Sequence, residues 1–193
     1  MAKLGLKYMV WAEIDSETEN AIPTYKTATA MVVGQMVSLN VAIQNSEGEL
    51  YADDMLAEYA SEFSSADLTA EVNNIPLENQ AKMYGARYTT DGEFSASADD
   101  NAPYGGVGGY QVLQVNGSRK YRAWFYTKAK ASMPDLDGST KGNSISFGTQ
   151  PIKMKVAAPK YGPWYYAKEF DTESAARTYI NGKVGYTEPS ATT

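Results

Sequence analysis

The chain contains no cysteine and no histidine. These absences exclude disulfide bonds, thiol nucleophiles, imidazole bases and every zinc site built on sulfur or imidazole ligands. No apolar run approaches the length of a membrane span, and Lys7 interrupts the first twelve residues, so the N-terminus lacks the apolar core of a signal peptide. We therefore expect a protein that is soluble where it is made and has no membrane partner.

Positive charge is missing from residues 27–81, where no lysine or arginine occurs although acidic residues are frequent. Residues 119–160 show the opposite balance, because their only acidic residues are Asp135 and Asp137. The net charge of −6 argues against a general affinity for nucleic acid. Two complementary blocks in one chain instead favour surfaces that meet head to tail in an assembly.

The prevailing sequence period is two, which predicts a protein built mainly from β-strands. Apolar and polar residues alternate over residues 4–14, 37–43 and 152–156, as half-buried strands require, and residues 162–170 read as a late, aromatic-rich strand. Residues 58–72 also alternate, but their apolar positions change from odd to even numbers along the segment. Such a slip predicts a β-bulge near Ser64-Ser65.

A β-hairpin is predicted around Asn116-Gly117, the favoured pair for a type I′ turn. This turn sets Val115 opposite Ser118, and the same register places five side chains on one face fit for burial. They are Tyr110, Val112, Tyr121, Ala123 and Phe125. The other face is expected to carry cations with two aromatic side chains between them, in the order Lys120, Arg122, Trp124, Tyr126, Lys128 and Lys130.

Two short helices complete the predicted fold. One is expected within residues 74–85, with Asn74 as its N-cap, and the other begins at Asp171 or Thr172 and stops at Gly182. A loop or arm is expected at residues 44–57, and loops are expected at residues 99–109 and 132–144. The sequence thus predicts a single, mainly β (α+β) domain over residues 1–182, with antiparallel strands, one or two short flanking helices and long loops, followed by a flexible tail at residues 183–193.

Three short motifs resemble catalytic or metal-binding sequences, but each lacks the context that its chemistry needs. Tyr51-Ala52-Asp53-Asp54 matches the Tyr-x-Asp-Asp of reverse transcriptases, in which adjacent carboxylates hold Mg²⁺, yet the polar residues 44–49 precede it where a buried strand is required. Residues 135–146 lack the central glycine and final glutamate of a calcium loop. The glycines of residues 105–109 lack the helix and the Lys-Ser/Thr of a phosphate-binding loop. We therefore expect no catalytic residue, no metal site and no cofactor.

The aromatic and basic residues leave two binding functions open. Cations and rings on the strand at residues 118–130 would suit a platform for single-stranded nucleic acid, although a solvated face or an intermolecular contact fits the acidic chain better. The 15 Tyr and 3 Trp could line a sugar-binding groove, although most alternate as in a sheet core. A carbohydrate- or surface-binding β-sandwich, such as a virion decoration or adhesin module, is therefore the alternative function.

Five segments, taken in order, resemble the major tail proteins of long-tailed, siphovirus-type phages that infect Gram-positive bacteria. The opening "KLGLKYMVWAEI" is similar to that family's first strand, and "LYADDMLAEYASEFSSADLTAEV" to its most recognisable segment. "LENQAKMYGA" is similar to its helix. "YRAWFYTKAKASMPDLDGSTKGNSISFGTQPIKMKVAA" follows the family's course of an aromatic-basic strand, an acidic loop and a further strand, and "GPWYYAKEFDTESAARTYI" resembles its closing strand and helix. The resemblance covers residues 2–182.

The resemblance implies a structural virion protein without an active site, made and assembled in the host bacterial cytoplasm and located in the phage tail. Family members form rings, typically hexamers, which stack into the tail tube that delivers the genome. The implied fold is a tail-tube-type β-sandwich or barrel with loops or arms that bridge the rings. The implied partners are further copies of the chain and the tape-measure, tail-terminator and distal tail proteins. DNA would pass without specific binding, because an acidic lumen repels its phosphates.

Three sets of charged residues are the candidate contact sites under this interpretation. An acidic loop touching the next ring or subunit would contain Glu47, Glu49, Asp53 and Asp54. An exposed or lumen-facing acidic strand face would carry Glu58, Glu62, Asp67 and Glu71. The complementary basic face would carry Lys120, Arg122, Lys128, Lys130, Lys153 and Lys155.

Overall fold

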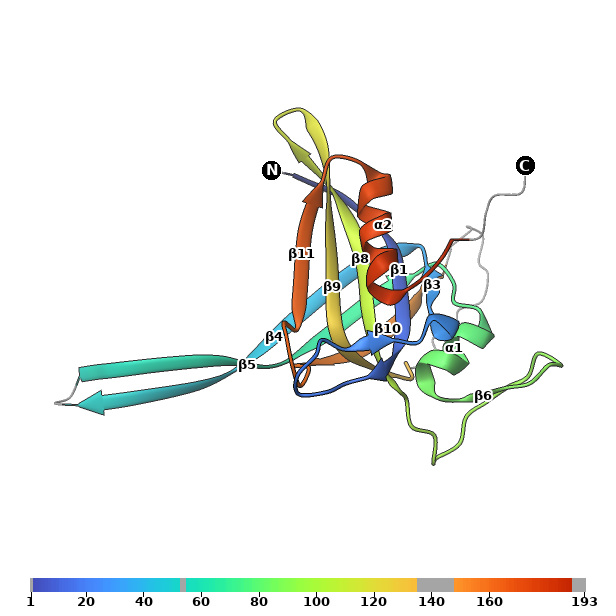
Figure 1. Cartoon of the computed structure of the whole chain (residues 1–193), viewed down its shortest axis with the longest axis horizontal. Helices are drawn as coiled ribbons and strands as arrows, with labels where there is room; N and C mark the ends of the chain where they lie inside the picture. The colour runs from blue at the N-terminus through green and yellow to red at the C-terminus, as the bar shows by residue number, and fades with distance from the viewer. Residues whose placement is uncertain (1, 53–54, 135–147, 189–193) are drawn as a thin grey trace, which may run out of the picture.

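The structure is a computed structural model that describes residues 2–52, 55–134 and 148–188 (Figure 1). Its strands are β1 (Ala2–Ser16), β2 (Thr24–Tyr25), β3 (Met31–Gly34), β4 (Met36–Ala52), β5 (Met55–Val72), β6 (Arg87–Tyr88), β7 (Phe94–Ser95), β8 (Tyr104–Val115), β9 (Ser118–Ser132), β10 (Gln150–Ala157) and β11 (Tyr165–Phe170). Its helices are the 3-10 helix η1 (Thr27–Thr29), α1 (Leu77–Tyr84) and α2 (Glu173–Val184). The predicted mainly β, antiparallel fold class with few helices is confirmed.

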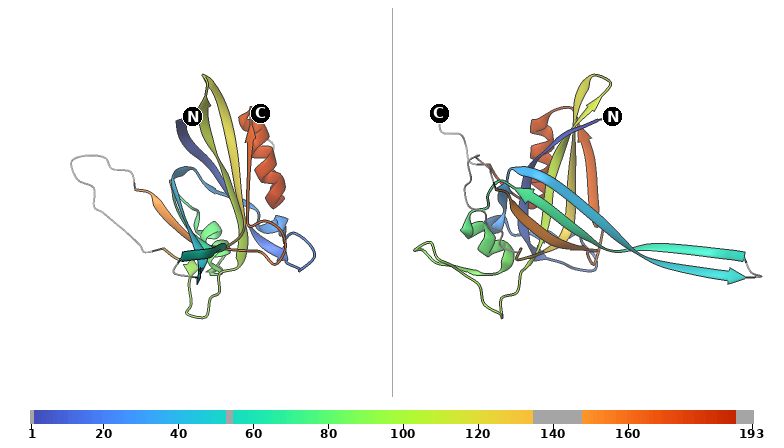
Figure 2. Two further views of the ribbon diagram at one scale, coloured as in Figure 1. Left: turned by 90° about the vertical axis from the view of Figure 1, so that its left-hand side faces the viewer. Right: turned by 180° about the vertical axis from the view of Figure 1, so that it is seen from behind.

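One large antiparallel sheet dominates the described residues, and it does not close into a barrel. The sheet folds into two layers because two strands share one edge of β9. β11 pairs with β9 residues 121–126, whereas β10 pairs with β9 residues 129–132. The first layer therefore contains β1, β8, β9 and β11 with the short β2 and β3, and the second contains β10, β5 and β4. Figures 1 and 2 show α2 on one side of the first layer and the β4–β5 pair on the other.

Two hydrophobic cores hold these layers together. The larger lies between the two sheet layers and includes Trp11, Trp124, Leu68, Ile152 and Met154. The smaller lies between the first layer and α2 and includes Val10, Tyr110, Phe125, Ala176 and Ile180. The middle of the first layer is thus buried on both faces.

Double burial corrects the prediction for β1, which was expected to be half-buried. Met9, Val10, Trp11 and Ala12 are all fully buried, because consecutive side chains enter opposite cores. A β-bulge precedes them: Lys7 pairs with Tyr110 and Val10 with Gly108, so two residues of β1 face one of β8. Tyr8, in this bulge, has a φ of 59°, a strained value for an aromatic residue.

The glycine-rich residues 105–109 were expected in a loop, and this prediction was wrong, because they form the buried N-terminal half of β8. The reason lies in the rings that cover them. A Cβ on Gly106 would lie 2.5 Å from the ring of Tyr25, and one on Gly109 would lie 2.6 Å from the ring of Trp124. Glycine is needed here so that large aromatic side chains can lie directly against the strand backbone.

The β8–β9 hairpin forms in the predicted register. Val115 pairs with Ser118 and Tyr110 with Ala123, and the turn residues Asn116 and Gly117 have φ values of 48° and 83°. The prediction for the second face was wrong at its centre. Trp124 and Tyr126 are only 3% and 8% exposed because the second sheet layer covers them. They are therefore not available as a stacking platform for nucleic acid.

Both helices lie in the predicted segments, but the start of α1 and the end of α2 differ from the prediction. The N-cap of α1 is Pro76 and not Asn74, and α1 ends as predicted at Gly85, with a φ of 68°. α2 follows Thr172, whose Oγ1 accepts the backbone N–H of Ala175 at 3.3 Å. It does not stop at Gly182 but continues to a buried Val184, because apolar residues still face the core there. Residues 183–188 thus continue the fold beyond the expected boundary, and residues 189–193 lie outside the described residues.

Candidate assembly interface

The outer part of the β4–β5 hairpin, residues 44–52 and 55–63, extends away from the two layers as an arm (Figures 1 and 2). A polar loop or arm was expected over residues 44–57. The loop was wrong, because β4 runs to Ala52 and β5 begins at Met55, so the segment is a strand-paired arm. Cross-strand pairing satisfies backbone groups whatever the side chains are, so a ladder of two strands can form without an apolar face. The polarity of the sequence concealed this strand.

The arm has almost no contact with the rest of the chain. Residues 44–49 and 58–62 are all exposed, and the ring of Tyr59 is 50% exposed. Isolated two-stranded ladders are marginally stable in water. The fold of the described residues therefore supplies little stabilisation to this ladder beyond its own pairing.

The arm begins at the predicted bulge. Gln44 pairs with Ser65 but Asn45 pairs with Phe63, which leaves Ser64 as the extra residue and confirms the expected position. The bulge compensates for the change from odd to even numbering along β5. Glu58, Glu62, Asp67 and Glu71 consequently lie on one face, opposite the even-numbered β4 residues Leu50, Ser46, Ala42 and Ser38. We call these four residues the acidic row.

The predicted acidic contact loop is divided by the structure. Glu47 pairs with Ser61 and Glu49 with Tyr59, so both glutamates lie on the arm face opposite to the acidic row. We call this second face, with Glu47, Glu49 and Tyr59, the tyrosine face. Asp53 and Asp54 lie outside the described residues.

A stacked pair of rings joins the arm to the body. The rings of Phe63 and Trp164 are parallel within 6°, with centroids 3.9 Å apart. Trp164 also contacts the rings of Tyr126 and Tyr165, at 6.1 Å and 5.6 Å. Offset stacks of this kind stabilise a contact beyond the area they bury. The direction of the arm is therefore fixed at its root by aromatic packing.

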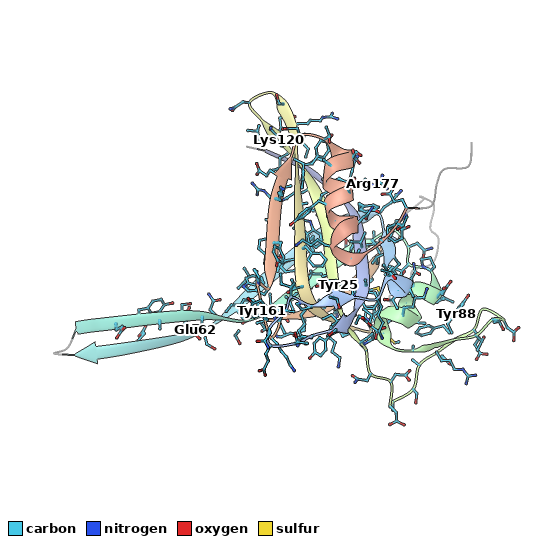
Figure 3. The ribbon with its side chains drawn as sticks, in the orientation of Figure 1. Tyr25, Glu62, Tyr88, Lys120, Tyr161 and Arg177 are labelled. Atoms are coloured by element: carbon cyan, nitrogen blue, oxygen red, sulfur yellow. The ribbon has the colours of Figure 1, made fainter. Side chains whose placement is uncertain are left out.

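The predicted basic face does not form one free surface, because ion pairs within the chain neutralise most of it. Lys120 pairs with Asp171, and Arg122 pairs with Glu169 at 2.6 Å. The pairing of β11 with β9 brings these two acidic residues close to the cations of β9. Neither of them belongs to a predicted acidic set. Figure 3 shows Lys120 at the far end of the body from Glu62 on the arm.

Three further members of the basic set lie together on the outer face of the β9–β10 pair, because Lys130 is the cross-strand partner of Lys155. Lys130 Nζ donates to Asn101 Oδ1 at 2.6 Å. Lys155 and Lys153 lie on the outer face of β10, and Lys155 contacts Asp67 of the acidic row at 3.0 Å because the two residues are cross-strand neighbours. The Lys155–Asp67 pair therefore joins the predicted acidic and basic sets within the body.

The last member of the set, Lys128, forms the most buried ion pair of the body. Its Nζ lies 2.8 Å from Glu17 Oε2, and both side chains are 15% exposed. Burial alone would raise the pKa of Glu17, but the hydrogen bonds from Lys128 and from the backbone N–H of Lys160 outweigh it and leave this pKa below its ordinary value. The pair ties the β1–β2 connection to β9.

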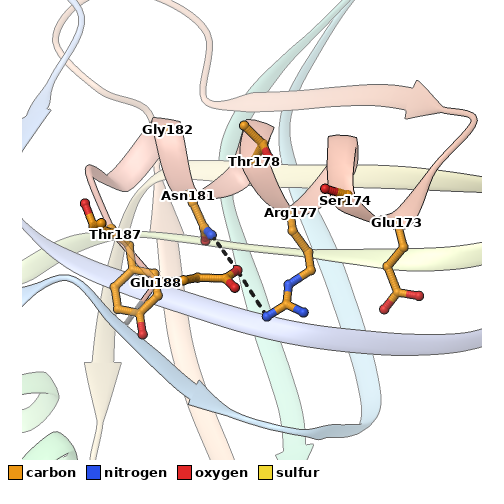
Figure 4. Close-up of a pocket in the computed structure, with 9 residues that line it drawn as sticks. Glu173, Ser174, Arg177, Thr178, Asn181, Gly182, Thr187 and Glu188 are labelled. Carbon is orange, nitrogen blue, oxygen red and sulfur yellow. Dashed lines mark hydrogen bonds and ion pairs between the residues drawn. The ribbon is translucent and has the colours of Figure 1, made fainter. Parts of the chain in front are cut away.

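A second polar cluster, which the sequence analysis did not predict, holds the C-terminal segment against α2. The Glu188 carboxylate accepts a hydrogen bond from Asn181 Nδ2 at 2.9 Å and lies 3.1 Å from Arg177 Nη2 (Figure 4). It also accepts a hydrogen bond from Tyr8 Oη at 3.2 Å. An open hollow of about 550 Å³ lies beside them along α2. Because Tyr8 and Glu188 come from opposite ends of the chain, no local spacing could have predicted this cluster.

Two unpaired strand edges and an apolar groove are further features of the surface. Within the described part of the chain β4 pairs only with β5, and β11 only with β9, so each leaves one edge unpaired. Unpaired edges are templates for further strands. Beside β4 lies an open groove of about 430 Å³ lined largely by apolar residues: Leu4, Leu6, Val37, Leu39, Val41, Trp124, Tyr126 and Tyr165.

Within residues 2–52, 55–134 and 148–188, no group of three acidic side chains is arranged to hold a metal ion. The helices described are too short and too polar to cross a bilayer. The two motifs that were weighed as metal sites, at residues 53–54 and 135–146, lie outside these ranges. No protein-family model matches the chain, and no curated protein matches it.

Proposed function

We propose that this protein is a structural virion protein that self-assembles into stacked rings, forming the tail tube through which a phage genome enters its host. The observation that carries the proposal is the arm, an ordered ladder that leaves the core and exposes side chains on both faces. The resemblance of residues 2–182 to major tail proteins supplies the kind of assembly. The chemistry is non-covalent, and no residue has a catalytic role.

Each exposed feature has a place in such an assembly. Rings and stacks use heterologous contacts, in which one subunit presents two unlike surfaces to its neighbours. The arm is one such surface, and the open edges of β4 and β11 are others, which neighbouring subunits would cover. The arm end of the acidic row, at Glu58 and Glu62, is the part that we assign to the lumen, where negative charge repels DNA phosphates, because Asp67 at the body end is paired with Lys155. Tape-measure, tail-terminator and distal tail proteins are the further partners of this proposal.

Assembly of the purified protein tests the proposal directly. Concentrated wild-type protein should form rings or tubes in negative-stain electron microscopy. A variant in which Asn-Gly replaces residues 46–62 keeps Asn45 beside Phe63 and should fold but stay monomeric, because it lacks the arm. Asp53→Asn/Asp54→Asn should also weaken tube formation while leaving the monomer folded. A wild-type protein that stays monomeric at high concentration and is absent from virion tails would overturn the proposal, and retention on immobilised glycans would then favour the binding module.

A further inference from the structure

A pair of lysines near the C-terminal end shares aromatic rings without a carboxylate partner. Lys183 Nζ lies 3.7 Å from the ring centroid of Tyr166, and Lys168 Nζ lies 5.3 Å from that of Phe170. Both ammonium groups also flank the ring of Tyr179, at 5.5 Å and 5.7 Å from its centroid. These five residues come from β11 and α2, and we call them the lysine patch.

The lysine patch has the electrostatic character of an anion site. Two like charges beside one ring repel each other, and in the described residues neither ammonium contacts an acidic side chain. The acids nearest in sequence are engaged elsewhere, since Glu169 pairs with Arg122 and Asp171 with Lys120. Burial lowers the pKa of Lys183, which shows that this charge is already partly removed from water. A carboxylate placed between the two lysines would relieve both effects.

The arm has the complementary composition. No lysine or arginine occurs in residues 27–81, so the arm contains no cation of its own. Its tyrosine face places Glu47 and Glu49 beside Tyr59, whose ring is half exposed. Acidic groups flanking an aromatic ring match ammonium groups that flank aromatic rings, and Tyr is one of the side chains that most often anchor protein interfaces.

We infer that the tyrosine face of one copy's arm docks on the lysine patch of a second copy. This inference rests on the proposed function and names the contact that the arm makes. The patch adjoins the unpaired edge of β11, so the docked arm also covers a strand edge that the monomer leaves open. The opposite arm face, with Glu58 and Glu62, stays free in this arrangement.

Charge exchange between the two surfaces tests the contact. Lys168→Glu/Lys183→Glu and Glu47→Lys/Glu49→Lys should each keep the melting curve of the monomer but reduce the sedimenting, tube-forming fraction at least tenfold. Combining all four substitutions restores opposite charges and should recover tubes. Glu58→Lys/Glu62→Lys is the matched control, because it makes the same change of charge on the other arm face and should assemble like the wild type.

The outcomes separate the docking from the proposed function. If the wild type assembles and the lysine variant assembles equally well, the docking is wrong while the tube proposal stands. The docking is also wrong if the variant with all four substitutions fails to form tubes. It is wrong too if Glu58→Lys/Glu62→Lys blocks assembly as strongly as Glu47→Lys/Glu49→Lys does. Loss of binding to a single-stranded DNA oligonucleotide by the lysine variant, with normal tubes, would assign the patch to phosphates and overturn the docking. A wild type that never associates overturns both proposals.

Discussion

Two hairpins of this molecule have the same backbone structure and opposite surroundings. In β8–β9 most of the central side chains are buried, with Tyr110 and Phe125 under α2 and Trp124 under the second layer. In the arm, the residues of the β4–β5 ladder from 44 to 49 and from 58 to 62 are all exposed. Pairing of backbone groups is therefore common to both and does not determine which hairpin belongs to the core.

The side chains determine which hairpin belongs to the core, because they decide whether other residues can pack against the strand backbone. The β8 strand uses glycines where Trp11 and Trp124 cover it, whereas a Cβ on Gly48 of the arm would meet nothing within 4 Å. The first hairpin is stabilised by the apolar surface that it buries, and the second gains little from its own chain. The exposed ladder is therefore the feature on which the proposed assembly role rests.

The largest effect is expected from replacing a glycine by alanine in the buried β8–β9 hairpin, with the same change in the arm as its control. In Gly109→Ala the new Cβ would lie 2.6 Å from the Trp124 ring and 2.8 Å from the carbonyl oxygen of Tyr8. Backbone cannot move away as a flexible side chain can, so we expect the free energy of unfolding to fall by roughly 2–3 kcal/mol, measured by urea denaturation. Gly48→Ala should change it by less than about 0.5 kcal/mol.

This pair of variants would break the comparison if the two losses were equal. Equal losses would mean that the arm is packed as tightly as the body, which contradicts its exposure. A neutral Gly109→Ala would show that β1 and β9 can separate at this point without cost, and the two-sided burial of β8 would then be wrong.

A smaller effect is expected where the two regions meet, at the Phe63–Trp164 stack. Phe63→Ala should lower the free energy of unfolding by about 1–2 kcal/mol, because it removes a ring that is partly buried and stacked. A double-mutant cycle with Trp164→Ala should give a coupling energy of about 1 kcal/mol. Tyr59→Ala, farther out on the same arm face, is the control and should leave monomer stability unchanged. A coupling near zero would show that the stack does not hold the root of the arm.

Some of the fold could be predicted because the information is local. Asn116-Gly117 specifies a turn whose φ values few other pairs adopt, and this alone fixed the register of β8 against β9. The shift of apolar numbering in β5 located the bulge to within a residue of Ser64. Gly85 ended α1 in the left-handed conformation for the same kind of reason.

Other features depend on partners far away in the chain, and the sequence could not supply them. The glycines of β8 are typical of a loop until the rings that cover them are known. The arm is typical of a loop because a solvated ladder needs no apolar alternation. Lys120 and Arg122 were expected on a free basic face, but the pairing of β11 with β9 brings Asp171 and Glu169 beside them. Acidic and basic blocks in a sequence therefore do not show which charges remain unpaired.

The smallest effect is expected at Glu17, whose contribution to the free energy of unfolding depends on pH. The pKa of Glu17 is lowered from its ordinary value of 4.5 in the folded protein, so its ionised form stabilises the fold. That contribution is complete above pH 4.5 and is lost as the pH falls through the lower, folded-state pKa. Glu17→Gln should therefore reduce the free energy of unfolding by about 1 kcal/mol at pH 7, and the difference from the wild type should shrink below pH 4.5. Glu62→Gln on the arm should leave the free energy of unfolding of the monomer unchanged at pH 7, because its side chain is exposed. If the two variants lost equal stability at pH 7, burial and ion pairing would not distinguish Glu17 of the body from Glu62 of the arm.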